Sequence, residues 1–501
     1  MVTRRRPAGR YPARSRRLHP GHSFARAGQA CERARHISLN PSPVQAAPTR
    51  FARVLKTRDV LMLSFGAMIG WSWILMTGYW VGNAGSFGTL IAFASGGLVI
   101  GFIALTYAEL ASAMPRAGGE HVYTHAGLGA GWSFVCTWAL LMAYVTVCVF
   151  ESVALPTAVE YLIPAIRMGA LWHVAGAPVD AGFILVGLAG AVVMTWINVV
   201  GIRTAAIVQG IVTVAIFVSG VVLFAGAAGF GLPELAEPKI AVPATGILTV
   251  LIMVPALLVG FDVLPQSAEE IDLPPKRIGR LLIVSLVMAV AWYGAIAWSV
   301  AVALTPEELA GDGLITADAA KKLWSVAAGG SWAGVALTIG GIGGVLTSWN
   351  AFIIGGSRVV FALAESGSLP AVFGRLHPRY KTPYVAVLAI GLLSCISPLF
   401  GRTILVWLIN CGSFAVVAAY LFVPIAFLAL RRSQPDLPRP YKLRYPRIVG
   451  MSAIVLALGL LCLFMPFSPS SLVWPQEWGI VLGWGAAGLL VWFTRRTRPP
   501  A

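Results

Sequence analysis

Charged residues are scarce in this chain. Asp, Glu, Lys and Arg make up 11% of its 501 residues, whereas hydrophobic residues make up 57%. So few charges cannot cover the surface of a water-soluble protein of this length. A soluble globular fold is therefore excluded, and most of the chain must face lipid.

The groups that membrane-embedded enzymes use are also missing. No histidine falls within the apolar segments, the motifs G-x-S-x-G and H-E-x-x-H do not occur, and the six cysteines lack metal-ligand spacing. His121 and His125 lie four residues apart beside Glu120, a spacing that can bind zinc on a helix, yet no further Cys or His is near them. We interpret that stretch as a surface loop, and we expect no metal, no cofactor and no enzymatic activity.

What the sequence does contain is a series of long apolar segments. A helix needs about 20 apolar residues to cross ~30 Å of hydrocarbon with all its backbone groups paired. Segments of this length predict an all-α polytopic membrane protein with twelve transmembrane helices. They lie at residues 60–84, 89–113, 131–161, 181–200, 205–230, 242–271, 281–304, 332–364, 383–400, 404–430, 448–465 and 479–493.

The placement of the basic residues predicts the orientation. After residue 50, 20 Lys and Arg residues fall on the side of the termini, five fall on the opposite side, and Arg358 lies inside a span. Because positive residues collect in short cytoplasmic loops, we expect both termini in the cytoplasm and the chain in the cell inner membrane.

The first 50 residues carry eleven Arg and one Glu, which accounts for much of the net charge of +17 without a nucleic-acid partner. This composition predicts disorder, and it lacks the apolar core of a secretory signal peptide. We expect residues 1–55 to form a disordered cytoplasmic tail and residues 56–497 to form the transmembrane domain.

Two of the apolar segments are interrupted by glycine and proline. The first contains Gly66 and Gly70, and the sixth contains Pro255 followed by the run 259–262. In transporters, matching breaks in two halves of the chain expose backbone around a buried binding site. Alternatively, the spacing of Gly66 and Gly70 serves helix packing. Because the breaks lie five spans apart, they predict two inverted repeats and two added helices, at about 60–230, 242–430 and 448–493.

Several short motifs resemble those of one family, the amino acid/polyamine/organocation permeases. They occur in the order and spacing of that family, over roughly residues 58–493. They are Tyr-Ala-Glu-Leu-Ala at 107–111, Pro-Arg-Ala-Gly-Gly at 115–119 with Tyr123, Gly-Phe-Asp at 260–262, Glu-Glu at 269–270, Pro-Lys-Arg at 275–277, Ser-Arg-Val at 357–359, Ala-Glu-Ser-Gly-Ser-Leu-Pro at 364–370, His-Pro at 377–378, Lys-Thr-Pro at 381–383, Arg-Arg at 431–432 and Pro-Asp-Leu-Pro-Arg-Pro at 435–440.

The resemblance implies a leucine-transporter-like fold of five plus five helices that works by alternating access. Substrate would sit midway across the membrane, between the broken first and sixth helices. Backbone N–H groups of the first break would hold a carboxylate, and carbonyl groups of the second would receive an amine. The residues implied are Ile69, Gly70, Trp71, Ser72, Val259, Gly260 and Phe261.

The chain departs from the family pattern at two positions. A bulky Trp71 stands in the first break, where the family usually has small residues, and the run Gly70-Trp71-Ser72 is similar to the ethanolamine permease branch. Some proton-coupled members carry a lysine in the fifth helix, and the matching position here is Ile216. A proton relay through that position is therefore not expected.

Glu151 lies in the third predicted helix, where the resemblance implies that it faces the substrate cavity. A carboxylate there would attract a primary ammonium group, and the alternative is a glutamate near the helix end that reaches water. Tyr144 and Trp138 of the same helix, with Phe261 and Trp71, are candidates for an aromatic enclosure around that ammonium.

Three further residues are candidates for coupling or gating. Asp262 follows the second break, where it either carries a proton or caps the next half-helix. Glu109 and Arg358 are expected at similar depth, which suggests a salt bridge that closes the cytoplasmic side.

Together these features predict a secondary active transporter that moves an amino acid or a small amine, coupled to protons or by exchange. Its partners would be the small-molecule substrate, protons and the lipid bilayer. One alternative is an ethanolamine- or polyamine-type amine permease. Another is a membrane sensor that binds solute without moving it, although such sensors usually carry a signalling domain.

Overall fold

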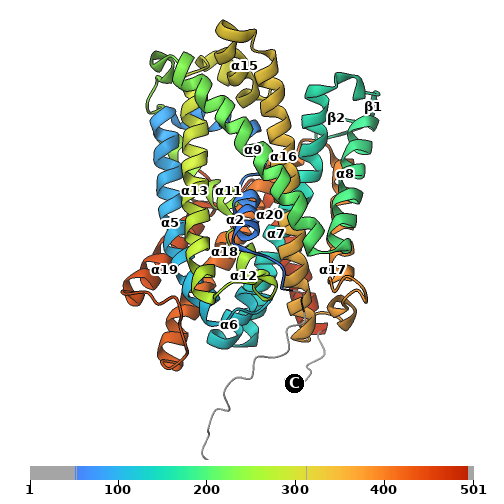
Figure 1. Ribbon diagram of the computed structural model, residues 1–501, viewed down its shortest axis with the longest axis vertical. Coiled ribbons are helices and arrows are strands. Elements are labelled where there is room, and N and C mark those ends of the chain that lie inside the picture. The colour runs from blue at the N-terminus through green and yellow to red at the C-terminus, as the bar shows by residue number, and fades with distance from the viewer. Residues whose placement is uncertain (1–50, 52, 71, 312, 495–501) are drawn as a thin grey trace, which may run out of the picture. The chain divides into compact units, whose positions relative to one another are not determined.

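The computed structural model describes residues 51–494 except 52, 71 and 312, and helices dominate that part of the chain (Figure 1). Ten of its helical segments are long and apolar enough to cross a membrane. They are α5 (Ser86–Ala113), α7 (Ala130–Leu162), α8 (Ala181–Val200), α9 (Ile202–Phe230), α10 to α12 (Gly246–Gln266), α13 (Pro275–Ala301), α16 (Ser331–Glu365), α18 (Ile404–Ser433), α19 (Pro446–Leu463) and α20 (Gln476–Thr494). The expected all-α polytopic membrane protein is confirmed.

Two of the twelve predicted spans are not among these ten. The first is divided into α2 (Thr57–Met68), α3 (Ser72–Leu75) and α4 (Thr77–Ala84). The ninth contains only α17 (Tyr384–Ile396), which continues as the 3-10 helix η5 (Ser397–Phe400). Both segments are helical and apolar, but neither provides one uninterrupted helix of membrane-spanning length.

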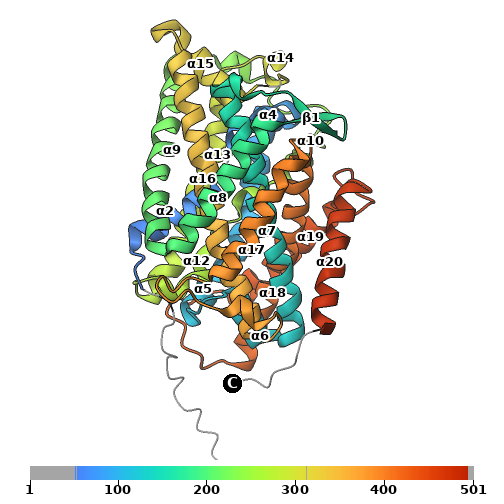
Figure 2. The same ribbon diagram turned by 90° about the vertical axis from the view of Figure 1, so that its right-hand side faces the viewer.

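Short elements join the long helices at the two ends of the bundle. A hairpin of β1 (Ala170–Val174) and β2 (Ala177–Asp180) pairs antiparallel. It lies at the same end as α15 (Ile315–Ala328), whereas α6 (Glu120–Leu128) lies at the opposite end (Figure 2). The remaining short helices are α14 (Pro306–Leu309), η1 (Pro164–Ile166), η2 (Pro233–Ala236), η3 (Ala268–Glu270) and η4 (Ala371–Gly374).

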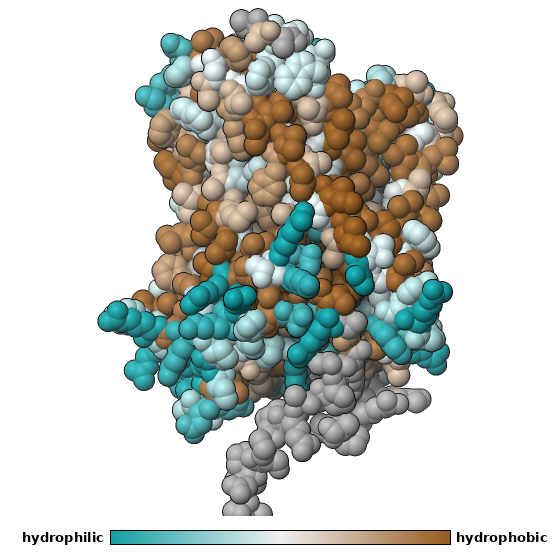
Figure 3. Space-filling view, viewed as in Figure 1, coloured by the Kyte–Doolittle hydropathy of each residue, from teal (hydrophilic) through white to brown (hydrophobic). Residues whose placement is uncertain are grey.

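The outer faces of the long helices are apolar, as a lipid environment requires. Ile211 of α9 and Leu490 of α20 are 69% and 67% exposed, a position that water would disfavour. On the face drawn in Figure 3, hydrophobic side chains fill the middle and hydrophilic side chains gather at the end where α6 and α12 lie. This pattern agrees with a band of protein surface that faces hydrocarbon.

The start of the described chain is held at that polar end. The backbone N–H groups of Val54 and Leu55 both donate to the carbonyl oxygen of Glu270, at 3.0 Å, and Phe51 packs edge-on against Phe361. These residues belong to the segment predicted as a tail, most of which lies outside the described residues.

Candidate functional site

Both predicted interruptions are present. The first separates α2, which ends at Met68, from α3, which begins at Ser72. The second separates α11 (Val254–Leu258) from α12 (Val263–Gln266), after a short α10 (Gly246–Leu251). The first helix stops because Ile69 leaves the helical conformation, with φ −102° and ψ 75°. The second stops because Val259 is extended and Gly260 has a φ of +131°.

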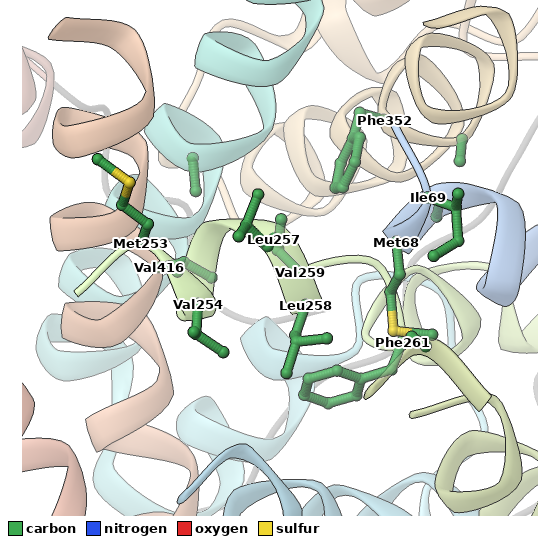
Figure 4. Packing of buried hydrophobic residues seen from close by; sticks show 14 of the residues in the cluster. Met68, Ile69, Met253, Val254, Leu257, Leu258, Val259, Phe261, Phe352 and Val416 are labelled. Carbon is green, nitrogen blue, oxygen red and sulfur yellow. The ribbon is translucent and has the colours of Figure 1, made fainter. Parts of the chain in front are cut away.

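The two interruptions touch each other. A Cβ atom placed on Gly260 would lie 2.7 Å from Ala67 Cβ, 2.9 Å from the Ala67 carbonyl carbon and 2.9 Å from the Met68 backbone nitrogen. Glycine is required at position 260 for two reasons: a side chain would collide with the end of α2, and residues other than glycine rarely adopt its φ. Figure 4 shows the apolar side chains around this meeting point, with Phe261 beside Met68.

A cavity of about 50 Å³ lies where the interruptions meet α7, α13, α16 and α18. It is lined by backbone and side chains of both interruptions, together with a few polar groups from the neighbouring helices. The predicted residues that line it are Gly70, Ser72, Val259 and Glu151. Its lining, a few polar groups in an apolar enclosure, is typical of a small-molecule site, although about 50 Å³ is smaller than the ~300–1,000 Å³ of most such sites.

Glu151 is the carboxylate of this cavity. It belongs to α7 and is 2% exposed, so it does not reach water at the helix end. The Ser348 hydroxyl of α16 donates a hydrogen bond to Glu151 Oε1, and a Cβ on Gly70 would lie 2.6 Å from the same oxygen. The carboxylate therefore stands directly against the first interruption. Ser348 has no sequence signal beyond its place in an apolar helix, and the sequence analysis missed it.

A hydroxyl pair holds the other side of the first interruption. Tyr293 of α13 donates from its hydroxyl to the Met68 carbonyl oxygen at 2.7 Å, and its Oη lies 3.3 Å from Ser72 Oγ. Tyr293 thus satisfies a carbonyl that the end of α2 leaves without a helical partner. The sequence analysis also missed this residue, because it lies in an unbroken helix.

Other predicted residues surround the cavity without lining it. Ile69, Tyr144, Gly260 and Phe261 are fully buried or nearly so, but none of these four is among the described residues that form its wall. Phe261 packs against the rings of Tyr107 and Tyr420, at centroid distances of 5.4 and 5.3 Å. Trp71, the other residue proposed for the aromatic enclosure, lies outside the described residues.

Trp138 belongs to a different cavity, of about 850 Å³, between α7, α18 and α20. Its indole N–H donates to the carbonyl oxygen of Trp484, and the indole N–H of Trp484 donates to the carbonyl oxygen of Trp138. The walls are tryptophan, phenylalanine and aliphatic side chains, and no carboxylate or basic group lines the described part. The smaller cavity is therefore the better candidate for a polar solute.

Asp262 lies at the N-cap position of α12 but does not cap it. No side-chain hydrogen bond runs from Asp262 to the first turn of α12. Instead, Oδ1 accepts from the Gly260 backbone N–H at 2.8 Å, and Oδ2 accepts from the Tyr144 hydroxyl at 2.7 Å. The capping interpretation is therefore wrong, because the carboxylate turns back toward the interruption and α7.

The predicted salt bridge between Glu109 and Arg358 is also wrong. Glu109 of α5 pairs with Arg431 at 2.5 Å and with Arg439 at 3.1 Å. Arg358 of α16 pairs with Glu270 at 2.7 Å, and both of these side chains are almost completely buried. Similar depth was the only basis for the pairing, and depth does not fix which way a helix turns its side chain.

The stretch around Glu120 and His121 is not a surface loop. It forms α6, and both side chains are buried. His121 Nδ1 lies 3.0 Å from Thr137 Oγ1 and 3.1 Å from Ser133 Oγ. Burial lowers the pKa of the His121 imidazole to about 4, so it is neutral at physiological pH. No group of three metal-ligating side chains is found in the part of the chain that the structure describes.

Known proteins resemble this chain over most of its length. The sequence profile of a family described as "Amino acid permease" matches residues 55–487. The branched-chain amino acid permease of Bacillus subtilis is 28% identical over 419 residues, which cover 82% of this chain and 87% of that protein. The methylthioribose transporter of the same organism is 23% identical over 459 residues, 91% and 96% of the two chains. The mouse cationic amino acid transporter 4 is 27% identical over 430 residues, 80% of this chain and 63% of the transporter.

Proposed function

This chain belongs to the amino acid permease family and is a membrane transporter, and we propose that it moves an amino acid or a small amine by alternating access. The proposal includes twelve transmembrane helices, arranged as inverted repeats at about 60–230 and 242–430 with two added helices. It places both termini in the cytoplasm and the chain in the cell inner membrane, as the distribution of basic residues favours.

The observation that carries the proposal is the cavity where the two interruptions meet. The first interruption supplies backbone around Gly70, and the second supplies Val259. Interrupted helices offer peptide dipoles to a charged solute at a depth where unbroken helices offer none. We assign the substrate to this cavity. Ile69, Gly260 and Phe261 would support its wall from the layer of residues behind the lining.

Glu151 supports a substrate that carries an ammonium group. A buried carboxylate is costly at membrane depth, and a cationic partner compensates part of that cost. Such a partner is the amine of an amino acid or of a compound such as ethanolamine. The named relatives include transporters of branched-chain and cationic amino acids and of methylthioribose, so similarity alone does not fix the substrate.

Uptake into proteoliposomes tests the proposal. The purified chain would be assayed with labelled neutral amino acids, basic amino acids and ethanolamine, with and without a pH gradient. We expect concentrative uptake of at least one amine-bearing compound. Binding of such a compound without uptake would favour a sensor, and transport of solutes without an amine would contradict the role of Glu151.

Substitution at Glu151 provides the matched comparison. A hydrogen bond to a charged group contributes ~1.5–3 kcal/mol, so Glu151→Gln should weaken uptake of an amine by about 10-fold or more. Glu477→Gln is the control, because Glu477 is equally buried but accepts from Asn410 in another part of the bundle. Equal uptake by both variants would remove Glu151 from the site.

A further inference from the structure

Glu120 is a fully buried carboxylate that the transport site does not use. It is the first residue of α6, and its Oε2 accepts a hydrogen bond from the side-chain amide of Gln266. Its other oxygen, Oε1, is buried and has no hydrogen-bond partner among the described residues. An ionised carboxylate with one bare oxygen is expensive to bury, and a bound proton removes most of that cost.

The chain brings Glu120 against the second interruption by a close backbone contact. Gly119 has a φ of +35°, and a Cβ placed on it would lie 3.0 Å from Pro265 Cβ and 3.1 Å from Gln266 Nε2. The backbone N–H of Gly118 donates to the Gln266 carbonyl oxygen at 3.4 Å. The start of α6 is thereby fixed to α12, so the state of Glu120 acts directly on the end of the second interruption.

No cation faces Glu120 from the described elements packed around it. The titratable groups that face it come from α5, α6, α7, α18 and the second interruption. They are Tyr107, Tyr123, Cys136, Tyr144, Tyr420 and Asp262. The adjacent His121 turns toward Ser133 and Thr137 and is neutral. The environment therefore disfavours negative charge on Glu120.

Asp262 and Glu120 differ in their hydrogen-bond donors. Both oxygens of Asp262 accept, one from the Gly260 N–H and one from the Tyr144 hydroxyl. Of the close side-chain and backbone contacts, two donate to Asp262 and one, from Gln266, donates to Glu120. The Glu120 backbone N–H and the Tyr107 hydroxyl also favour ionised Glu120, but less than burial and the charge of Asp262 disfavour it. Burial, and then the negative charge of Asp262, raise the pKa of the Glu120 carboxyl well above its usual value. When one proton is shared between these two sites, it belongs on Glu120.

We propose that Glu120 is a proton-binding site, in which the proton adds to the carboxylate of Glu120 while the negative charge stays on Asp262. The amide of Gln266 can serve both states, because its NH₂ donates to the carboxylate and its carbonyl oxygen accepts from the acid. Protonation thus exchanges one hydrogen bond for another between α6 and α12. Its use in coupling transport to protons rests on the function proposed above, whereas proton binding itself does not.

Infrared spectroscopy of the purified full chain tests the proposal without a substrate. A protonated buried carboxyl group gives a carbonyl stretching band that disappears when the group ionises. The band would be recorded against pH for the wild type, Glu120→Gln, Asp262→Asn and the control Glu269→Gln. Glu269 is a partly exposed neighbour that accepts from the Ala117 backbone N–H at 3.2 Å.

We expect an acid band at neutral pH that is lost in Glu120→Gln and kept in Glu269→Gln. Asp262→Asn should keep the band and shift its titration to lower pH, because the negative neighbour is gone. This second variant leaves Glu120 in place, so the test does not depend on folding of Glu120→Gln. A band that persists in Glu120→Gln, or that vanishes in Asp262→Asn, would overturn the assignment. If the bands behave as expected but no compound is taken up, the proton site stands and the transport proposal fails.

Discussion

Substitution of Gly260 by alanine probes the contact between the two interruptions. The added methyl group would lie 2.7 Å from Ala67 Cβ and 2.9 Å from two backbone atoms, so backbone has to move. Overpacking of this kind costs about 1–3 kcal/mol. A φ of +131° adds strain of ~1–3 kcal/mol for any residue with a Cβ.

The expected total is therefore about 2–6 kcal/mol, a large share of the stability of a typical domain. Part of this cost can be relieved if α11 and α12 move away from α2, and that movement would open the cavity. We therefore expect Gly260→Ala to lower the apparent melting temperature in detergent and to reduce uptake in proteoliposomes by at least 10-fold.

Gly101→Ala is the control for this experiment. Gly101 lies in the middle of α5, and a Cβ placed there meets no atom within 4 Å beyond its own helix. Alanine in a helix interior is favoured over glycine by about 0.5–1 kcal/mol, so this variant should be as stable as the wild type or slightly more so. If Gly260→Ala matches Gly101→Ala in both melting temperature and uptake, the two interruptions do not touch as described.

Three further predictions concern neighbouring groups. Ser348→Ala removes the donor to the Glu151 carboxylate and should raise the KM for an amine about 10-fold, measured by initial uptake rates; an unchanged KM would argue against that contact. Arg358→Gln leaves Glu270 buried without its partner and should destabilise the protein by ~3–5 kcal/mol. The double variant that exchanges Arg358 and Glu270 should recover the melting temperature, whereas neither half of the exchange should recover it alone. The pKa of Glu120 is raised in the folded state, so above a pH of about 4.5 the folded protein binds more protons than the unfolded protein. The stability of the wild type should therefore fall as the pH rises from there. The stability of Glu120→Gln should fall less steeply when its melting temperature is measured over the same pH range.

The interruptions could be predicted because their chemistry is local. Gly70 lies just beyond the end of one helix and the run from Val259 to Asp262 follows the end of another. Glycine in these stretches stands out against Leu, Val and Ile. These breaks depend on the residues themselves and little on how distant helices turn. The position of Glu151 beside the cavity was implied by the family resemblance, because a carboxylate in an apolar helix needs a cavity or a partner but does not say which one.

The partners of buried charges could not be predicted in the same way. Glu109 and Arg358 lie at similar depth on α5 and α16, yet each faces a different neighbour, because rotation about the helix axis decides contact. Arg431 reaches Glu109 from the end of α18, over 322 positions of sequence separation. Glu120 was not recognised for a related reason: sequence between two spans suggests a loop, and here it folds into a helix whose first residues are buried.

The central claim is that solute binds where the two interrupted helices meet. A density map of the protein with a transported compound bound tests this most directly. The account predicts density between Gly70 and Val259, with the ammonium group beside Glu151. Density for the compound among the tryptophans of the larger cavity, with the space beside Glu151 closed, would contradict it.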